Sequence, residues 1–189
     1  VSVDGVNVKD YSQKELRNKI GYVSQKATLF TGTIESNVAY GDNGQKNASE
    51  TDIKKALDIA QASEFVDSLA DGSKAYVAQG GSNFSGGQKQ RMSIARAIAR
   101  KPEILIFDDS FSALDYKTDR VLREALAKSC KDSTRIIVAQ RSGTIRDADR
   151  IIVLEDGKIA GMGRHEELMR DCEVYRQIAL SQLSKGELA

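Results

Sequence analysis

The chain has 189 residues, of which 40% are hydrophobic and 29% charged, and its formal net charge is +1 at pH 7. These values predict one globular domain with a core of its own, and they give no charge field that favours nucleic acid or an anionic membrane. The sequence has no apolar run of the ~18 residues that a membrane span needs and no signal-peptide pattern. Its two cysteines, Cys130 and Cys172, lie outside any CxxC pair, which suits a reduced, cytosolic compartment.

The first quarter of the chain predicts short elements joined by turns. VSVDGVNV alternates apolar and polar residues around Asp4-Gly5, which predicts a β-hairpin. Ser12 and Glu15 have capping-box spacing, so a helix is expected to follow Ser12. After it we expect a strand over 20–25, a loop with a short helix over 29–41 and a polar loop over 41–47.

Helices and apolar strands alternate in the rest of the chain. Ser49 is expected to cap a helix that ends near residue 62, and Ser85 and Gln88 again have capping-box spacing, before a helix that Pro102 ends. The remaining expected elements are a helix over 63–69, strands over 104–107 and 135–140, a helix over 115–128, a hairpin over 150–163, and helices over 165–171 and 174–183. This alternation predicts an α/β fold with a mostly parallel sheet covered on both faces, plus an antiparallel hairpin.

The stretch NFSGGQKQR, residues 83–91, is a candidate anion site. A serine and two glycines at a helix start leave several backbone N–H groups uncovered, and these donors, the helix dipole and the hydroxyl attract anions. The glycines alone also fit an ordinary helix cap with a flexible lead-in.

A second candidate site lies at the end of the apolar strand ILIF, where Asp108 and Asp109 stand side by side. Neighbouring carboxylates raise each other's pKa unless a cation or a partner offsets their charge. Solvated acids in a strand-end turn would give the same local pattern.

These strings, taken together, resemble the ATPases of the ATP-binding-cassette (ABC) family, in which FSGGQKQR is similar to the signature motif, ILIFDD to the Walker B strand and SALD to the D-loop. The resemblance implies ATP and Mg²⁺ as cofactors. It implies that the signature touches the γ-phosphate of an ATP held by the opposite subunit, that Asp108 holds Mg²⁺ directly or through water, and that Asp109 orients or deprotonates the attacking water. The signature residues would be Phe84, Ser85, Gly86, Gly87 and Gln88, and those of the D-loop Ser112, Ala113, Leu114 and Asp115.

Further segments resemble the family in its own order. Gln25, which closes IGYVSQ, is similar to the Q-loop glutamine that senses Mg²⁺ and the membrane domain. LFTGTIESNVAYG and AQGGSNF resemble exporter segments, although Gln79 stands where the exporters usually have Glu. GRHEEL also fits, and its His165 is expected to cap a helix rather than to catalyse.

The resemblance covers nearly the whole chain and implies a P-loop NTPase-like (RecA-like) sheet with a helical signature subdomain, incomplete at the N-terminus. Residues 1–48 would form the Q-loop part of the core and residues 49–101 the helical subdomain. Residues 102–189 would contain Walker B, the D-loop, the switch loop and the C-terminal helices.

Two departures from the family pattern concern catalysis. Asp109 stands where the family usually has Glu, and this shorter side chain places its carboxylate roughly 1 Å farther from the attacking water, which can cost about 100-fold in rate. Gln140, in IIVAQ, stands where the family usually has the switch histidine, and an amide offers no titratable proton. Both changes predict the weakened site of an asymmetric, heterodimeric exporter, whose intact signature serves the partner's ATP.

A third departure is that the sequence contains no GxxxxGK[ST]. In the family this Walker A loop lies upstream of the segment that VSVDG resembles, so the membrane domain, the adenine-stacking aromatic residue and Walker A are expected to be missing here. Without that phosphate grip, the 189 residues alone are expected neither to bind ATP tightly nor to hydrolyse it. A strand is also expected to be missing beside the switch-loop strand, which predicts self-association or strand exchange.

The resemblance also implies partners and a place in the cell. It implies a second, non-identical nucleotide-binding domain, coupling helices of a transmembrane domain and the cytoplasmic face of the cell membrane, and it leaves the exported substrate open among drugs, lipids and peptides.

Two alternatives stay open. A soluble cassette ATPase of DNA repair or chromosome structure would insert long coiled coils between the Q-loop and the signature, whereas about 60 residues without sustained heptads separate Gln25 from Ser85. A non-catalytic regulatory subunit is the other alternative, against which the intact FSGGQ indicates retained nucleotide contact.

Overall fold

A computed structural model describes residues 1–41, 44 and 47–186, with side chains up to Gln182. The polar loop expected over 41–47 lies largely outside the described residues. Contacts divide the chain into two compact units, Val1–Val138 and Ala139–Ala189, which are described separately below. The functional subdivision at residues 48 and 101 stays a prediction.

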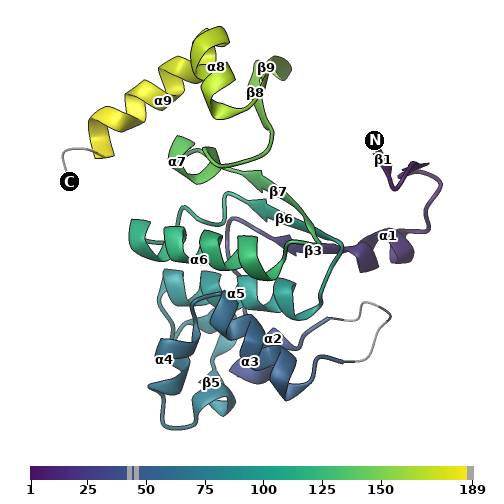
Figure 1. Ribbon diagram of the computed structural model, residues 1–189. Coiled ribbons are helices and arrows are strands. Elements are labelled where there is room, and N and C mark those ends of the chain that lie inside the picture. The colour runs from purple at the N-terminus through teal and green to yellow at the C-terminus, as the bar shows by residue number, and fades with distance from the viewer. Residues whose placement is uncertain (42–43, 45–46, 187–189) are drawn as a thin grey trace. The chain divides into compact units, whose positions relative to one another are not determined.

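The first unit contains a three-stranded parallel sheet (Figure 1). Its strand order is β3-β6-β7, with bounds Ile20–Val23, Ile104–Asp108 and Thr134–Val138. Val23 pairs with Phe107, and Asp108 pairs with Val138. The predicted α/β fold with a parallel sheet is therefore confirmed, and the carboxyl ends of all three strands meet at one edge.

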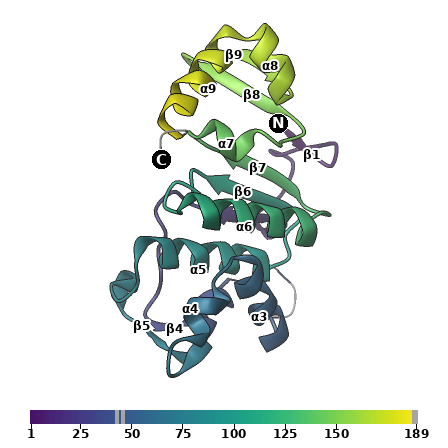
Figure 2. The same cartoon turned by 60° about the vertical axis from the view of Figure 1, so that its left-hand side comes forward.

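Helices cover one face of this sheet. The central helix α5 (Gly86–Ala99) packs against β3, α2 (Ile34–Val38) and α3 (Glu50–Ile59), and Figure 2 shows it between α6 (Tyr116–Ser129) and the helices α3 and α4 (Ser63–Asp67). Val23, Leu105 and Phe107 face this layer and are buried. Gly21 allows the close approach, because a Cβ there would lie 2.8 Å from Pro102 Cγ.

The opposite face of the sheet is exposed within this unit. Tyr22, Ile136 and Val138 are 56%, 48% and 52% exposed. In the described structure β7 pairs with β6 alone, so it forms an edge of the sheet. The prediction of cover on both faces is therefore wrong for this unit, because the described helices pack on one side only.

The smaller elements of the first unit follow local signals, with one exception. The N-terminal hairpin β1–β2 (Ser2–Val3, Val6–Asn7) turns at Asp4 and Gly5, which have positive φ, and α1 (Gln13–Lys19) begins with the predicted capping box. The unpredicted pair is β4 (Gly32–Thr33) with β5 (Tyr76–Val77), which are antiparallel. Short 3-10 turns cover Gly72–Lys74 and Gln79–Gly81.

The second unit has a small core of its own around the predicted hairpin. Its elements are α7 (Ser142–Ile145), β8 (Ile151–Glu155), β9 (Lys158–Gly163), α8 (His165–Asp171) and α9 (Glu173–Gly186). The expectation that His165 caps a helix is wrong: Arg164 precedes α8 as its cap residue, and His165 Nδ1 lies 2.8 Å from the Tyr175 hydroxyl. Among the described residues, no helix combines the length and the apolar character that a membrane crossing requires.

Candidate functional site

The two neighbouring acids lie at the carboxyl edge of the parallel sheet, and each accepts a hydrogen bond from the segment around β3. Asp108 is the last residue of β6, and its Oδ2 accepts a 2.8 Å hydrogen bond from the Tyr22 hydroxyl. Asp109 Oδ2 accepts a 2.9 Å hydrogen bond from Gln25 Nε2. The structure therefore brings the predicted Gln25 to the predicted acids. It also adds Tyr22, for which the sequence gives no local signal beyond an aromatic residue in a strand.

The pKa of Tyr22 is raised from its ordinary value, chiefly because its hydroxyl donates to the Asp108 carboxylate. The phenol therefore keeps its proton, and with it the ability to donate, at any physiological pH. Both acids are half-buried, so they remain within reach of a ligand.

The backbone at Asp109 is bent out of the strand. Its φ is +44°, its N–H donates to Val138 O at 2.9 Å, and its carbonyl accepts a 2.6 Å hydrogen bond from Ser112 Oγ. Asp and Asn tolerate this left-handed conformation better than longer side chains do. The shorter acid therefore suits the local backbone.

The D-loop-like segment is anchored at its apolar residue and exposed at its small ones. Leu114 is buried, whereas Ser112 and Ala113 are exposed. Asp115 caps α6 by accepting from Thr118 N at 2.9 Å and from Thr118 Oγ1 at 2.7 Å. The hydrogen bond from the Thr118 backbone is the main reason why the pKa of Asp115 lies below its ordinary value.

The first turn of α5 is open to solvent and lies against this loop. A Cβ on Gly87 would lie 3.5 Å from Ala113 O, whereas one on Gly86 would meet nothing within 4 Å. Ser85 Oγ accepts from Gln88 N at 3.2 Å, and Ser85 N donates to Gln88 Oε1 at 2.9 Å. The cap uses the hydroxyl as an acceptor, so its O–H remains available to donate to an anion.

Phe84 has a different role from its neighbours in the string. Its ring is half-buried and lies edge-on to Phe65, with centroids 6.4 Å apart. The Arg91 guanidinium lies 4.8 Å from the centroid of the Phe65 ring and donates to Gln61 O at 2.6 Å. The Phe84 side chain therefore anchors the start of α5, while Ser85 and Gly86 stay exposed and Gly87 is half-buried.

Two polar side chains of α5 hold the segment around Gln25. Gln90, which is buried, donates from Nε2 to Ser24 O at 3.1 Å. Arg96 donates from Nε to Asn37 O at 2.8 Å, from NH2 to Asn37 Oδ1 at 2.8 Å and from NH1 to Thr28 O at 2.9 Å. One helix thus connects the exposed Ser85 turn with the residues on both sides of Gln25.

Gln140 belongs to the second unit. Its backbone carbonyl accepts a 2.5 Å hydrogen bond from Gln182 Nε2, and Gln182 Oε1 accepts one of 2.6 Å from Ser142 N. These contacts fix the start of α7 to α9. That Gln140 joins Asp108 and Asp109 in one site stays a prediction.

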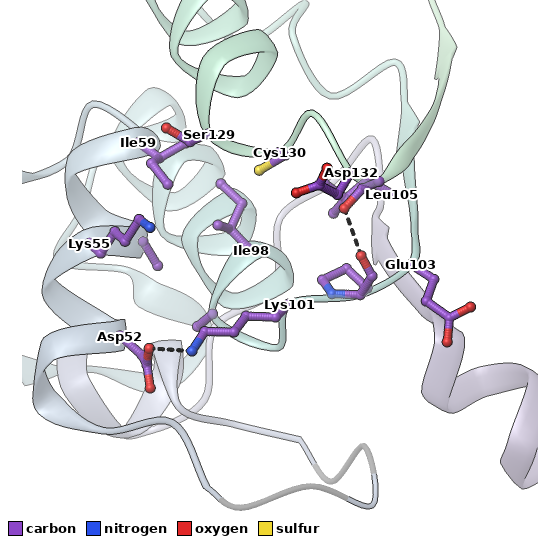
Figure 3. A pocket seen from close by; sticks show the side chains of 14 residues that line it. Asp52, Lys55, Ile59, Ile98, Lys101, Glu103, Leu105, Ser129, Cys130 and Asp132 are labelled. Carbon is purple, nitrogen blue, oxygen red and sulfur yellow. Dashed lines mark hydrogen bonds and ion pairs between the residues drawn. The ribbon is translucent and has the colours of Figure 1, made fainter.

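A hollow of about 350 Å³ lies at the other end of β6, beside residues that begin the strand (Figure 3). An ion pair between Asp52 and Lys101, 2.6 Å long, lies at its wall (Figure 3). Ser133 and Pro102 also line it, and Ser133 Oγ donates to Pro102 O at 2.7 Å. Burial raises the pKa of the Cys130 thiol in its wall. Since Asp108 ends the strand, this hollow is separate from the paired acids.

Comparison with known proteins identifies the family. The model of the ABC transporter family matches residues 1–112, more than half of the chain. The chain belongs to the ABC transporter family. An ABC transporter ATP-binding protein of Mycobacterium tuberculosis is 45% identical over 182 residues, which are 96% of this chain and 31% of that protein. The ATP-dependent lipid A-core flippase of Vibrio vulnificus is 39% identical over 186 residues, 98% of this chain and 32% of the flippase.

A solved structure shows the same ABC transporter fold. A bacterial Atm1-family ABC exporter with ATP bound matches with a TM-score of 0.89 and 35% identity, over 95% of this chain and 31% of the exporter chain. The chain thus spans about a third of the length of these bacterial relatives. At this level of identity, the fold of the chain is that of an ABC exporter's ATP-binding domain.

The donor set at the acids fits the Mg²⁺ that ABC ATPases use with ATP. Carboxylate and amide oxygens are hard donors, and Mg²⁺ in nucleotide sites is commonly held by one or two carboxylates together with substrate phosphates. Within the described residues, no group of three or more His, Cys, Asp or Glu side chains could hold a metal by itself. Asp108 and Asp109, with the Gln25 amide beside them, offer oxygen donors of the kind that such nucleotide sites use.

Proposed function

We propose that this chain is part of an ATP-binding and ATP-hydrolysing domain that powers export, on the cytoplasmic face of a membrane, within a longer ABC transporter. The observation that carries the proposal is the meeting of Gln25 with the acids of β6 at the same sheet edge. The relatives support it by their names, which include an exporter and a flippase.

In this function the residues at the carboxyl edge of the sheet would have separate roles in binding the metal and in activating the water. Asp108 and the Gln25 amide oxygen would hold Mg²⁺, which neutralises phosphate charge when it is bound with ATP. Asp109, held by Gln25 Nε2, would orient the attacking water and accept its proton. Gln140 would donate an amide hydrogen bond to a phosphate oxygen but could not move a proton.

The exposed first turn of α5 would serve a different nucleotide. The N–H groups of Gly86 and Gly87 make no hydrogen bond in the described structure, and together with the Ser85 hydroxyl they suit the γ-phosphate of an ATP on a second nucleotide-binding domain. With Asp109 and Gln140 at its own site and an intact signature for the other, the chain would form the weaker half of a non-identical pair.

The remainder of the transporter would supply the main phosphate grip and cover the sheet. The sequence has no GxxxxGK[ST], and Tyr22, Ile136 and Val138 are exposed on one sheet face. We infer that a segment of the longer protein packs there and that the 189 residues alone neither bind ATP tightly nor hydrolyse it. Produced alone, the chain would associate through the β7 edge. The segment held by Arg96, after Gln25, would receive a coupling helix of the membrane domain.

The test uses the whole transporter, reconstituted with its partner. Asp108→Asn should abolish Mg²⁺-dependent ATP hydrolysis at this site, and the double change Asp109→Glu with Gln140→His should raise it. Unchanged turnover in both variants would contradict the proposed function, whereas loss in the first without gain in the second would contradict only the weakened site.

A further inference from the structure

The sheet face that carries Asp108 also carries Tyr22. Tyr22 pairs with Ile106 in the parallel register of β3 and β6, and Asp108 lies two residues beyond Ile106. Side chains two residues apart on a strand share a face, so Tyr22 lies one step behind Asp108 on the neighbouring strand. Its phenol spans this step, and its hydroxyl donates to Oδ2 at 2.8 Å.

In the described structure, Tyr22 is the one hydrogen-bond donor to the Asp108 carboxylate. The bond occupies Oδ2 and leaves Oδ1 for a ligand. Rotation of an aspartate about its terminal torsion is broad and roughly two-fold, so a carboxylate without a donor samples a wide range of orientations. A donor on one oxygen narrows that range.

We propose that Tyr22 is a positioning residue that orients the Asp108 carboxylate toward Mg²⁺-ATP. The inference rests on the proposed function, since it assigns Asp108 to the metal. Carboxylates that bind metals are commonly hydrogen-bonded themselves, and loss of such a partner costs about 10- to 100-fold in metal affinity or activity.

The neighbouring acid, Asp109, accepts its hydrogen bond from a different residue. Gln25, three residues after Tyr22, donates to Asp109 rather than to Asp108. Each acid therefore has a donor of its own from the same segment, and removal of one donor should affect one acid. This gives the proposal a specific signature: loss of the Tyr22 hydroxyl should weaken metal binding while the contact of Gln25 with Asp109 stays in place.

The matched change is Tyr22→Phe, which keeps the ring on the sheet face and removes only the donor. The experiment uses the whole transporter, a non-hydrolysable ATP analogue and Mn²⁺ in place of Mg²⁺, with bound Mn²⁺ measured by electron paramagnetic resonance. Tyr22→Phe should weaken Mn²⁺ binding at this site about 10-fold, while affinity for the analogue in EDTA stays unchanged. Tyr76→Phe, another exposed tyrosine of the first unit, should have no effect.

The Asp108→Asn variant separates the possible outcomes. It should lose Mn²⁺ at this site, and adding Tyr22→Phe to it should cost nothing further, because coupled residues are not additive. If Asp108→Asn weakens binding and Tyr22→Phe does not, the positioning role is wrong and the proposed function stands. If Asp108→Asn leaves Mn²⁺ binding intact, the assignment of the metal to Asp108 is wrong, and the inference is overturned with it.

Discussion

Gln25 and Asp109 are 84 residues apart in the sequence and are joined by a 2.9 Å hydrogen bond in the structure. The parallel pairing of β3 with β6 produces this contact. Val23 pairs with Phe107, so the residues that follow each of these two strands leave the sheet at the same edge. The amide nitrogen is used by Asp109, so the amide oxygen is the atom that remains for a cation.

Replacement of Asp109 by the longer Glu should raise the rate of ATP hydrolysis and lower the stability of the fold. Asp109→Glu should raise ATP turnover of the whole transporter by up to about 100-fold, since the carboxylate moves about 1 Å closer to the attacking water. It should also lower the free energy of unfolding by about 1 kcal/mol, because φ is +44° at this residue. Steady-state ATPase assays and thermal unfolding check the two effects. Asp109→Asn is the control, and a gain of turnover in that variant would contradict the role of the carboxylate.

The hydroxyl of Ser85 should matter for more than its cap. Ser85→Ala and Ser49→Ala each remove a capping box from a helix of the first unit, so each should lower stability by about 1 kcal/mol. Only Ser85→Ala should also reduce ATP-dependent association with the partner nucleotide-binding domain, measured by crosslinking. Equal effects of the two variants on association would mean that Ser85 is a cap and nothing else.

Arg96 should be among the most sensitive positions for stability. Arg96→Met removes three donors from Asn37 and Thr28, and Asn37 is only 1% exposed, so we expect a loss of about 3 kcal/mol. Arg120→Met, which breaks an exposed ion pair with Glu124, should cost less than about 0.5 kcal/mol. Chemical unfolding of both variants measures the difference, and similar losses would show that Arg96 contributes no more than a surface charge.

Acid should destabilise the fold partly through Asp52. Hydrogen bonds from Lys101 first, and then from Ser49, lower the pKa of Asp52 from 3.8 to about 2. Between about pH 4 and pH 2 the unfolded chain therefore binds a proton that the folded chain does not, and stability falls as pH falls through this window. Asp52→Asn keeps an acceptor for Ser49 and should flatten the unfolding profile there. Lys101→Gln should act in the same direction, and an unchanged slope in both would exclude this group as the cause.

Local signals in the sequence predicted the elements that local contacts determine. The capping boxes expected at Ser12 and Ser85 and the helix cap expected at Ser49 are present, because a cap involves residues only three apart. The pair β4–β5 was missed because each strand is two residues long and its partner lies more than 40 residues away, so neither contains a periodic pattern. Cover on both sheet faces was predicted from apolar runs, which do not distinguish a face that helices cover from one that stays exposed.

The sequence predicts those candidate site residues that lie within distinctive strings, but not those whose contacts depend on strand register or on packing. The distinctive strings around Asp108, Asp109 and Gln25 predict them as site residues, and in the structure Gln25 donates a hydrogen bond to Asp109. Tyr22 was not predicted, because its contact with Asp108 depends on the register of two strands that are far apart in the chain. The half-buried position of Phe84 beside an exposed Ser85 depends on the contact of its ring with Phe65. The spacing of residues in the sequence does not predict that contact.

Helix α5 has 14 residues, so it is a rod of about 21 Å. Its first turn is exposed, and farther along it Gln90 and Arg96 grip Ser24 and Asn37. Such a rod behaves as a lever, since backbone hydrogen bonds resist its bending along the whole length. In the proposed function, a displacement of Ser85 on binding the partner's ATP would be transmitted along α5 to the residues that flank Gln25, because no hinge interrupts the helix. Binding of the partner's ATP would thereby change the geometry around the ATP of this chain.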